Sequence, residues 1–215
     1  MAPPRRGFFI SVEGADGSGK STQIVRLAAH LRAKGHDVVV TREPGGGGEG
    51  ALALRDLLLN GPVERWTPIA EALLMYAARA EHLDRLIRPA LAAGKTVLTD
   101  RFADSTMAYQ GAAGGLGRAR IGSLHEAVVG ADNPDLTLIL DVPVAVGLAR
   151  AGLRLSGEAR FESKGEAYQA QVRQAFLDIA RTDSSRCRVI DASADEETVA
   201  RAVANAVDAA LQSRP

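Results

Sequence analysis

A lysine and a serine that close a glycine-rich run have the clearest chemistry in this sequence. Residues 14–21 read GADGSGKS, which fits the phosphate-binding pattern G-x-x-x-x-G-K-[ST]. The backbone N–H groups of such a loop can point at phosphate oxygens, Lys20 can reach the outer phosphates, and the Ser21 hydroxyl can ligate Mg²⁺. The alternative is a glycine-rich turn with an incidental lysine. We expect the phosphates to be surrounded by Gly14, Ala15, Asp16, Gly17, Ser18, Gly19, Lys20, Ser21 and Thr22.

Further acidic and basic side chains follow other apolar runs of the sequence. Asp100 comes directly after the run 95–99 and could hold Mg²⁺, directly or through water, or form an ordinary ion pair. Arg101 can bind a phosphate through two parallel hydrogen bonds, and Arg42, at the end of another run, suggests a second anion site. Asp16 needs a partner such as a sugar hydroxyl or water-bound Mg²⁺, unless solvent alone surrounds it.

The segment 150–160, RAGLRLSGEAR, is basic and has little helical patterning. Phosphoryl transfer gains from positive charge brought to the transferring group, and a closing segment could supply it through Arg150, Arg154 or Arg160. A solvated basic helix surface explains the same residues equally well. The four histidines lack a metal-binding spacing and no other catalytic motif is present. The sequence therefore favours transfer of a phosphoryl group between two bound molecules.

The elements that must position these side chains alternate between short apolar strands and amphipathic helices. Strands are predicted at 8–12, 36–41, 95–99, 136–142 and 187–191, and helices at 21–34, 51–59, 67–93, 120–130, 143–153, 163–181 and 193–211. This order predicts an α/β fold with a five-stranded parallel sheet flanked by helices. Ligands of such sheets bind beyond the carboxyl ends of the strands, where the charged residues described above would meet.

Three local predictions follow from helix capping, periodicity and glycine content. The residues Ser163 and Ser193, each followed three positions later by glutamate, are expected to cap the last two helices. The helix at 67–93 is expected to bury a stripe made of Ile69, Leu73, Tyr76, Ala80, Leu83 and Ile87. Residues 105–110 suggest a helical turn, and the glycine-rich stretch 111–117 suggests a loop.

Composition points to one soluble globular domain. The 215 residues suffice for a single domain, 1–215, with a full core, and 46% apolar and 24% charged residues are ordinary values. Lysine plus arginine equals aspartate plus glutamate, 26 each, so overall charge gives no case for a nucleic-acid or membrane partner. The one cysteine, Cys187, lies in an apolar run and is expected to be buried. We recognise no membrane-spanning run or signal peptide and expect a cytoplasmic location.

Several stretches coincide with those of one family. They are VEGADGSGKST, TREPGG, LLMYAARAEH, RPALAAG, DRFADSTMAYQG and PDLTLILDV. Through them the sequence resembles the thymidylate kinases of the bacterial type over nearly its whole length. The resemblance implies transfer of the γ-phosphoryl group of ATP to dTMP, giving dTDP and ADP with the help of Mg²⁺. It also implies a nucleoside-monophosphate-kinase fold and a homodimer packed through helices.

The same resemblance implies roles for single residues. Arg101 would bind the dTMP phosphate, Arg79 the thymine ring, and Asp16 the sugar and the transfer region. The residues around dTMP would be Asp16, Arg42, Pro44, Met75, Arg79, Arg101, Ser105, Tyr109 and Gln110. Tyr109 would crowd a ribose 2′-hydroxyl, and the Glu43–Pro44 bond would be cis. On the ATP side, Arg150 and Ser193 would join the phosphate-binding loop, while Ser21 and Asp100 would hold the metal.

The resemblance also indicates where the catalytic arginine comes from. One branch of the family carries an arginine after the acid of the phosphate-binding loop, where this sequence has Gly17. The other branch places it in a lid, which favours a lid at about 150–162 with Arg154 as the transition-state contact. Met75 stands where phenylalanine often stacks on thymine, and a polarizable methionine can also lie against a ring.

Three other functions remain open at this point. A kinase for another nucleotide or for a deoxynucleoside would share the loop, although a deoxynucleoside would leave Arg101 and Arg42 without an anion. A GTP-driven switch would need a guanine-reading N-K-x-D motif, which the stretch 133–135, NPD, does not fit. An inactive nucleotide-binding module is the third, and the complete phosphate-binding motif argues against it.

Overall fold

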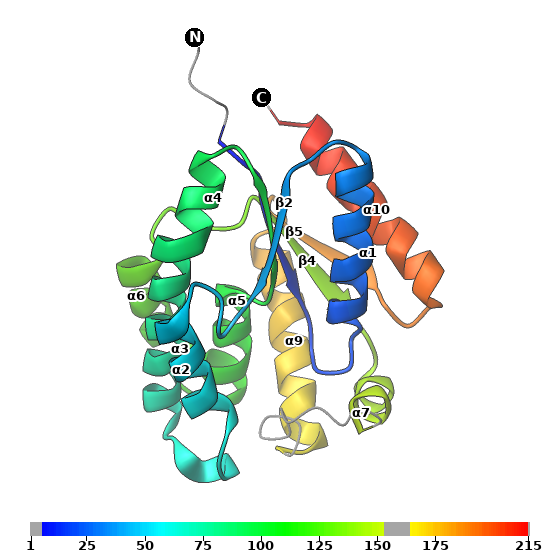
Figure 1. Ribbon diagram of the computed structural model, residues 1–215. Helices are drawn as coiled ribbons and strands as arrows, with labels where there is room; N and C mark the ends of the chain where they lie inside the picture. Colours follow the sequence, from blue (N-terminus) through cyan, green and yellow to red (C-terminus); the bar gives the residue numbers. More distant parts are fainter. Residues whose placement is uncertain (1–5, 153–163, 215) are drawn as a thin grey trace.

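Five parallel strands form the centre of the molecule in the computed structural model, which describes residues 6–152 and 164–214 (Figure 1). They are β1 (Phe9–Glu13), β2 (Val38–Arg42), β3 (Thr96–Asp100), β4 (Leu136–Asp141) and β5 (Cys187–Asp191), in the order β2-β3-β1-β4-β5. The register pairs Asp100 with Val12 of β1 on one side and with Arg42 of β2 on the other. The predicted parallel sheet is confirmed, and its charged strand ends lie along one edge.

Helices cover both faces of the sheet. Before β3 come α1 (Lys20–Ala33), α2 (Glu49–Leu59), a 3₁₀ turn at Val63–Arg65, α3 (Pro68–His82), the π-helical η2 (Leu83–Ile87) and α4 (Arg88–Ala92). After β3 come α5 (Ala103–Thr106), the π-helical η3 (Met107–Ala113), α6 (Arg118–Val128), α7 (Val144–Gly152), α9 (Glu166–Thr182) and α10 (Glu196–Gln212). Figure 1 shows α1 and α10 together on one side of the sheet, with α3, α4 and α6 on the other.

The central strand β1 is buried on both faces. Ile10 and Val12 pack with the helices α1 and α10, whereas Phe9 packs on the opposite face with Tyr76 of α3 and with Phe102. A strand covered on both sides favours apolar residues on both faces, as Phe9, Ile10 and Val12 show, while the two buried polar residues, Ser11 and Glu13, bond to each other. Its carboxyl end leads directly into the glycine-rich loop.

The capping residue predicted for the last helix was wrong. Helix α10 is capped by Asp195, whose side chain accepts a hydrogen bond from the Thr198 N–H at 2.9 Å, while Ser193 bonds to Asp191 instead. Helix α9 begins at Glu166 after Gly165, and Ser163 lies outside the described residues. At the helix predicted for 67–93, Thr67 does accept from the Ala70 N–H, as expected for a capping threonine before a proline.

The stripe predicted for α3 is only partly buried. Tyr76, Leu83 and Ile87 are in the core, but Ile69 is 39% and Leu73 is 50% exposed. Helix α3 turns its Ala72 and Arg79 side inward, so Ile69 and Leu73 lie on the outer flank of the apolar surface. Helical periodicity identifies an apolar side, but it does not say how much of that side the rest of the chain covers.

The predicted loop at 111–117 is also corrected. Helical structure continues from α5 through η3 as far as Ala113. A Cβ atom on Gly111 would lie 3.1 Å from both Ile121 and Met107, so glycine allows close packing there instead of ending the helix.

The remaining predictions about the whole chain can be compared directly. No helix in residues 6–152 and 164–214 has the length and hydropathy of a membrane span. Cys187 is buried as predicted, and burial raises the pKa of its thiol to about 12. A thiol that keeps its proton is a poor nucleophile, so Cys187 has a packing role.

Candidate active site

The glycine-rich loop between β1 and α1 forms a cradle around its own lysine. Gly14, Gly17 and Gly19 adopt positive φ angles, which other residues rarely adopt, and α1 begins immediately after them. The Lys20 ammonium donates to the carbonyl oxygens of Gly14 at 3.1 Å and Ala15 at 3.0 Å. Burial, followed by the charge of Arg101, lowers the pKa of Lys20 to about 8. Burial and the positive charge of Arg101 therefore outweigh the nearby carboxylates of Asp100 and Asp16, and a phosphate would favour the charged form of Lys20.

The two predicted metal ligands lie side by side. The Ser21 hydroxyl donates to Asp100 Oδ2 at 3.1 Å, although the two residues are far apart in the sequence. Among the described residues, no group of three or more histidine, cysteine, aspartate and glutamate side chains could hold a metal. One hydroxyl and one carboxylate beside a phosphate-binding loop nevertheless fit Mg²⁺, which is usually bound by one or two protein ligands, by water and by substrate phosphates.

Arg101 links the glycine-rich loop to the neighbouring pocket. Its Nη1 donates to Gly14 O and to Ser105 Oγ, both at 3.1 Å, and its Nη2 donates to Asp16 Oδ1 at 2.5 Å and to Tyr109 Oη at 3.2 Å. The backbone of Arg101, the residue directly after β3, has a φ of 69°, in the left-handed region. Such strain at a charged residue is common at functional sites.

Asp16 is held in its ionised form by this cluster. It accepts from Arg101 and, through Oδ2, from the Tyr109 hydroxyl at 3.2 Å. Burial alone would raise the pKa of Asp16, but the charges of Arg101 and Lys20 outweigh it and keep the pKa below its usual value. The sequence analysis predicted that Asp16 needs a partner, and Arg101 is such a partner in the structure.

One pocket extends from the loop toward β2, α3 and η3. All the residues that the sequence analysis assigned to the acceptor nucleotide line it, namely Asp16, Arg42, Pro44, Met75, Arg79, Arg101, Ser105, Tyr109 and Gln110. Gly17, Lys20, Ser21 and Asp100 line the same pocket at its loop end. The Glu43–Pro44 bond at its rim is cis, as predicted.

Arg150 and Ser193, which were predicted for the ATP side, do not line this pocket. Arg150, at the end of α7, donates to Ala192 O at 3.0 Å, which places it beside Ser193. The two residues are therefore close to one another, on the β5 side of the sheet. Arg154 and Arg160 lie outside the described residues.

Sequence reasoning missed Glu13, a fully buried acid directly before the loop. It accepts hydrogen bonds from the Phe102 N–H and the Ser105 hydroxyl, both at 2.6 Å, and from Ser11 at 2.8 Å. Burial, followed by the charge of Asp104, raises the pKa of Glu13 to about 7. The sequence did carry a signal, because Glu13 ends a largely apolar strand. A carboxylate that is buried with such a strand requires hydrogen-bond donors around it.

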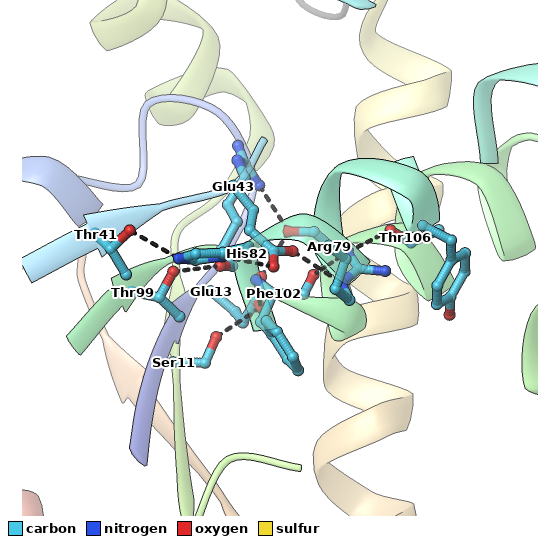
Figure 2. Close-up of polar contacts among 12 residues, drawn as sticks. Ser11, Glu13, Thr41, Glu43, Arg79, His82, Thr99, Phe102 and Thr106 are labelled. Carbon is cyan, nitrogen blue, oxygen red and sulfur yellow. Dashed lines mark hydrogen bonds and ion pairs between the residues drawn. The ribbon is translucent and has the colours of Figure 1, made fainter. Parts of the chain in front are cut away.

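A second cluster that the sequence did not reveal is formed by Glu43, which lines the pocket, and His82, which does not (Figure 2). Glu43 Oε2 accepts from Arg79 Nε at 2.8 Å, and Glu43 Oε1 lies 2.9 Å from His82 Nδ1.

Comparisons with known proteins agree on one family. The family model described as thymidylate kinase matches residues 12–203. The thymidylate kinase of Caulobacter vibrioides is 57% identical over 202 residues, covering 94% of this chain and 96% of the relative. That of Dinoroseobacter shibae is 53% identical over 194 residues, covering 90% and 93%. The crystal structure of thymidylate kinase from Ehrlichia chaffeensis matches with a TM-score of 0.77 and 32% identity, covering 94% of this chain and 99% of that one.

Proposed function

Since this chain belongs to the thymidylate kinase family and transfers the γ-phosphoryl group of ATP to dTMP, we propose that the pocket beside the glycine-rich loop binds dTMP. The observation that supports this assignment best is the position of Arg101. Its guanidinium contacts Gly14 and Asp16 of the loop on one side and Ser105 and Tyr109 of the pocket on the other. A cation at such a junction can bind the acceptor phosphate while the loop holds the donor.

In this assignment the ligands replace contacts that these side chains make within the protein. The Lys20 ammonium donates to the carbonyl oxygens of Gly14 and Ala15, and it would donate to the phosphates of ATP instead. The dTMP phosphate would bind Arg101, with Arg42 as a second cation at the pocket wall. Asp16 and Tyr109 would then face the sugar. Catalysis consists of bringing the two phosphates together and neutralising their charge.

We propose that Mg²⁺ is held by Ser21 and Asp100 together with phosphate oxygens of ATP. When bound, the ion neutralises charge on the transferring group. Asp100→Asn keeps the hydrogen-bond geometry with Ser21 but removes the charge, so the Mg²⁺ concentration needed for half-maximal rate should rise about tenfold or more. An unchanged Mg²⁺ requirement would exclude Asp100 as a ligand.

The lid arginines complete the proposal. Arg150 bonds the Ala192 carbonyl beside Ser193, which suits a position near the adenosine end of ATP. Arg154 is proposed to contact the transferring phosphoryl group, with Arg160 as the alternative. Arg154→Ala should lower kcat far more than the affinity for either substrate, since charge that acts only in the transition state does not stabilise the ground state.

We propose that the chain forms a homodimer through the neighbouring helices α2 and α3. Their exposed apolar side chains are Leu52, Leu57, Ile69 and Leu73. A second copy would cover this surface, since apolar area is stabilised when it leaves water. Leu73→Glu should then produce a monomer of 22.6 kDa by light scattering, whereas Val25→Glu, at an exposed position on α1, should leave the dimer intact.

The experiment for the whole proposal is ADP formation from ATP and Mg²⁺ with dTMP, dUMP, UMP, CMP, AMP and thymidine offered in parallel. Turnover chiefly with dTMP is the expected outcome and would show that Met75 permits thymine recognition. Turnover chiefly with another acceptor would contradict the assignment of the base-binding residues. An enzyme of free nucleotides would act in the cytoplasm, which is the location that we propose.

A further inference from the structure

Arg79 has a buried nitrogen that the described part of the protein leaves unpaired. Only 2% of the Arg79 residue is exposed. Its Nε donates to Glu43 Oε2 at 2.8 Å, and its Nη2 donates to Thr106 Oγ1 at 2.9 Å and to Phe102 O at 3.2 Å. Its Nη1 has no hydrogen-bond partner among the described residues, although Arg79 lines the acceptor pocket. An unpaired buried N–H of a cation is costly, so this nitrogen points to an acceptor atom on a ligand.

The other side of Glu43 is bound by a residue that does not reach the pocket. His82 is fully buried, and its Nδ1 lies 2.9 Å from Glu43 Oε1. Its Nε2 lies 2.8 Å from Thr41 Oγ1 on β2. A carboxylate can only accept, so Nδ1 carries a proton and donates to Glu43, and Nε2 of a neutral imidazole with this tautomer accepts from the threonine hydroxyl. Figure 2 shows the resulting chain from Thr41 through His82 and Glu43 to Arg79.

The glycines of the loop after β2 close over this chain. A Cβ atom on Gly46 would lie 2.4 Å from both His82 Nε2 and Thr41 Oγ1. A Cβ atom on Gly47 would lie 2.7 Å from His82 Cα. Two of the four consecutive glycines are therefore required because the loop backbone passes directly over His82. This cover leaves the imidazole little room to turn away from Glu43.

We propose that His82 is a positioning residue for acceptor recognition. By donating to Glu43, it holds the carboxylate that fixes Arg79, so that Arg79 Nη1 faces the base of the acceptor. This inference rests on the proposed location of dTMP in the pocket. A guanidinium only donates hydrogen bonds, so Arg79 favours a base that presents a carbonyl oxygen over one that presents an amino group. His82 would therefore affect the choice between dTMP and dCMP without touching either.

A matched pair of substitutions separates the donor from the imidazole as a whole. In His82→Asn, the amide nitrogen occupies the place of Nδ1 and can still donate to Glu43. In His82→Gln, it occupies the place of Nε2, and the donor to Glu43 is lost. We expect His82→Gln to raise the KM for dTMP about tenfold and to reduce the preference for dTMP over dCMP, with the KM for ATP changed less than about twofold. The expected effect of His82→Asn is less than about threefold.

A double-substitution cycle tests whether His82 acts through Arg79. In an Arg79→Lys background, His82→Gln should add less than about twofold to the KM for dTMP, because the group that it positions is gone. A full additional tenfold would overturn the inference, as would equal effects of the two His82 variants. If Arg79→Lys alone leaves the KM for dTMP unchanged, the proposed base contact of Arg79 fails instead. Thr41→Val, which removes the hydroxyl but keeps the shape, provides a milder variant if His82→Gln does not fold.

Discussion

Gly17 and Gly147 meet backbone to backbone, in a contact that leaves no room for a side chain on the first. A Cβ atom on Gly17 would lie 1.9 Å from the Gly147 carbonyl oxygen. Gly147 lies in α7, the helix that leads into the segment proposed as the lid. The phosphate-binding loop thus packs directly on the helix before the lid. This contact gives a physical reason why the chain has no arginine at position 17 and would supply the catalytic arginine from the lid.

The first prediction compares two glycines with similar backbones. Gly17 has a φ of 76° and Gly35 a φ of 86°, but a Cβ atom on Gly35 would have no neighbour within 4 Å. Gly35→Ala should therefore cost about 1–2 kcal/mol of stability and leave the KM for ATP unchanged. Gly17→Ala should in addition raise the KM for ATP about tenfold or more, because the loop must shift away from α7. Equal ATP kinetics in the two variants would show that the contact does not shape the loop.

The second prediction concerns the junction between the two phosphate sites. Arg101→Ala should weaken dTMP binding about thirtyfold, equivalent to roughly 2 kcal/mol for a charge-assisted contact, while ATP binding largely survives. Equilibrium binding of each nucleotide alone is the measurement. Arg26→Ala, which removes exposed ion pairs to Glu196 and Glu197, is a control that should change neither affinity. If ATP affinity collapses while dTMP affinity holds, the two sites have been assigned the wrong way round.

The position of residues that belong to short motifs could be predicted from the sequence, because the carboxyl ends of parallel strands lie along one edge of the sheet. Ser21 and Asp100 were predicted to share a metal on that ground, and the structure places their side chains in hydrogen-bond contact. Met75 and Arg79 could not be placed in this way, because a helix face says nothing of what lies opposite. The family resemblance assigned them to the acceptor pocket, and both line it.

The missed features depend on partners that are distant in the sequence. Glu13 reads as an ordinary strand-end acid until the turn after β3 brings Phe102 and Ser105 onto its carboxylate. Ser193 was predicted to cap the last helix, but the chain entering α10 places Asp195 at that position instead. Local pattern ranks such alternatives, whereas the tertiary contacts select one.

The third prediction follows from the raised pKa of Glu13. Burial, followed by the charge of Asp104, raises this pKa from 4.5 to about 7, so between these pH values the folded protein holds a proton that the unfolded chain releases. The contribution of this proton to the free energy of unfolding, on the order of 3 kcal/mol, is fully present below pH 4.5 and is lost as the pH rises through 7. Glu13→Gln should remove this loss, so its stability relative to the parent should rise between pH 5 and pH 8 in urea unfolding.

The same variant should be a poorer enzyme. Glu13 accepts from Ser105, which in turn accepts from Arg101, so an amide in its place changes the support of the arginine that we propose binds the dTMP phosphate. We expect a higher KM for dTMP together with the stability gain at pH 8. If the difference in stability between Glu13→Gln and the parent is the same at pH 5 and at pH 8, the raised pKa of Glu13 is contradicted.

The last prediction concerns the pH dependence of ATP binding. Burial, followed by the charge of Arg101, lowers the pKa of Lys20 to about 8, so the ammonium is charged below that pH and loses its charge above it. Phosphates attract only the charged form, so the KM for ATP should be constant up to about pH 8 and then rise by up to about tenfold per pH unit. The KM for dTMP serves as the internal control, since Arg101 stays charged in this range and its pKa is raised further by Tyr109 and Asp16, despite burial. A KM for ATP that stays flat from pH 7 to pH 10 would show that Lys20 keeps its proton without phosphate, and that the loop carbonyls alone stabilise the ammonium.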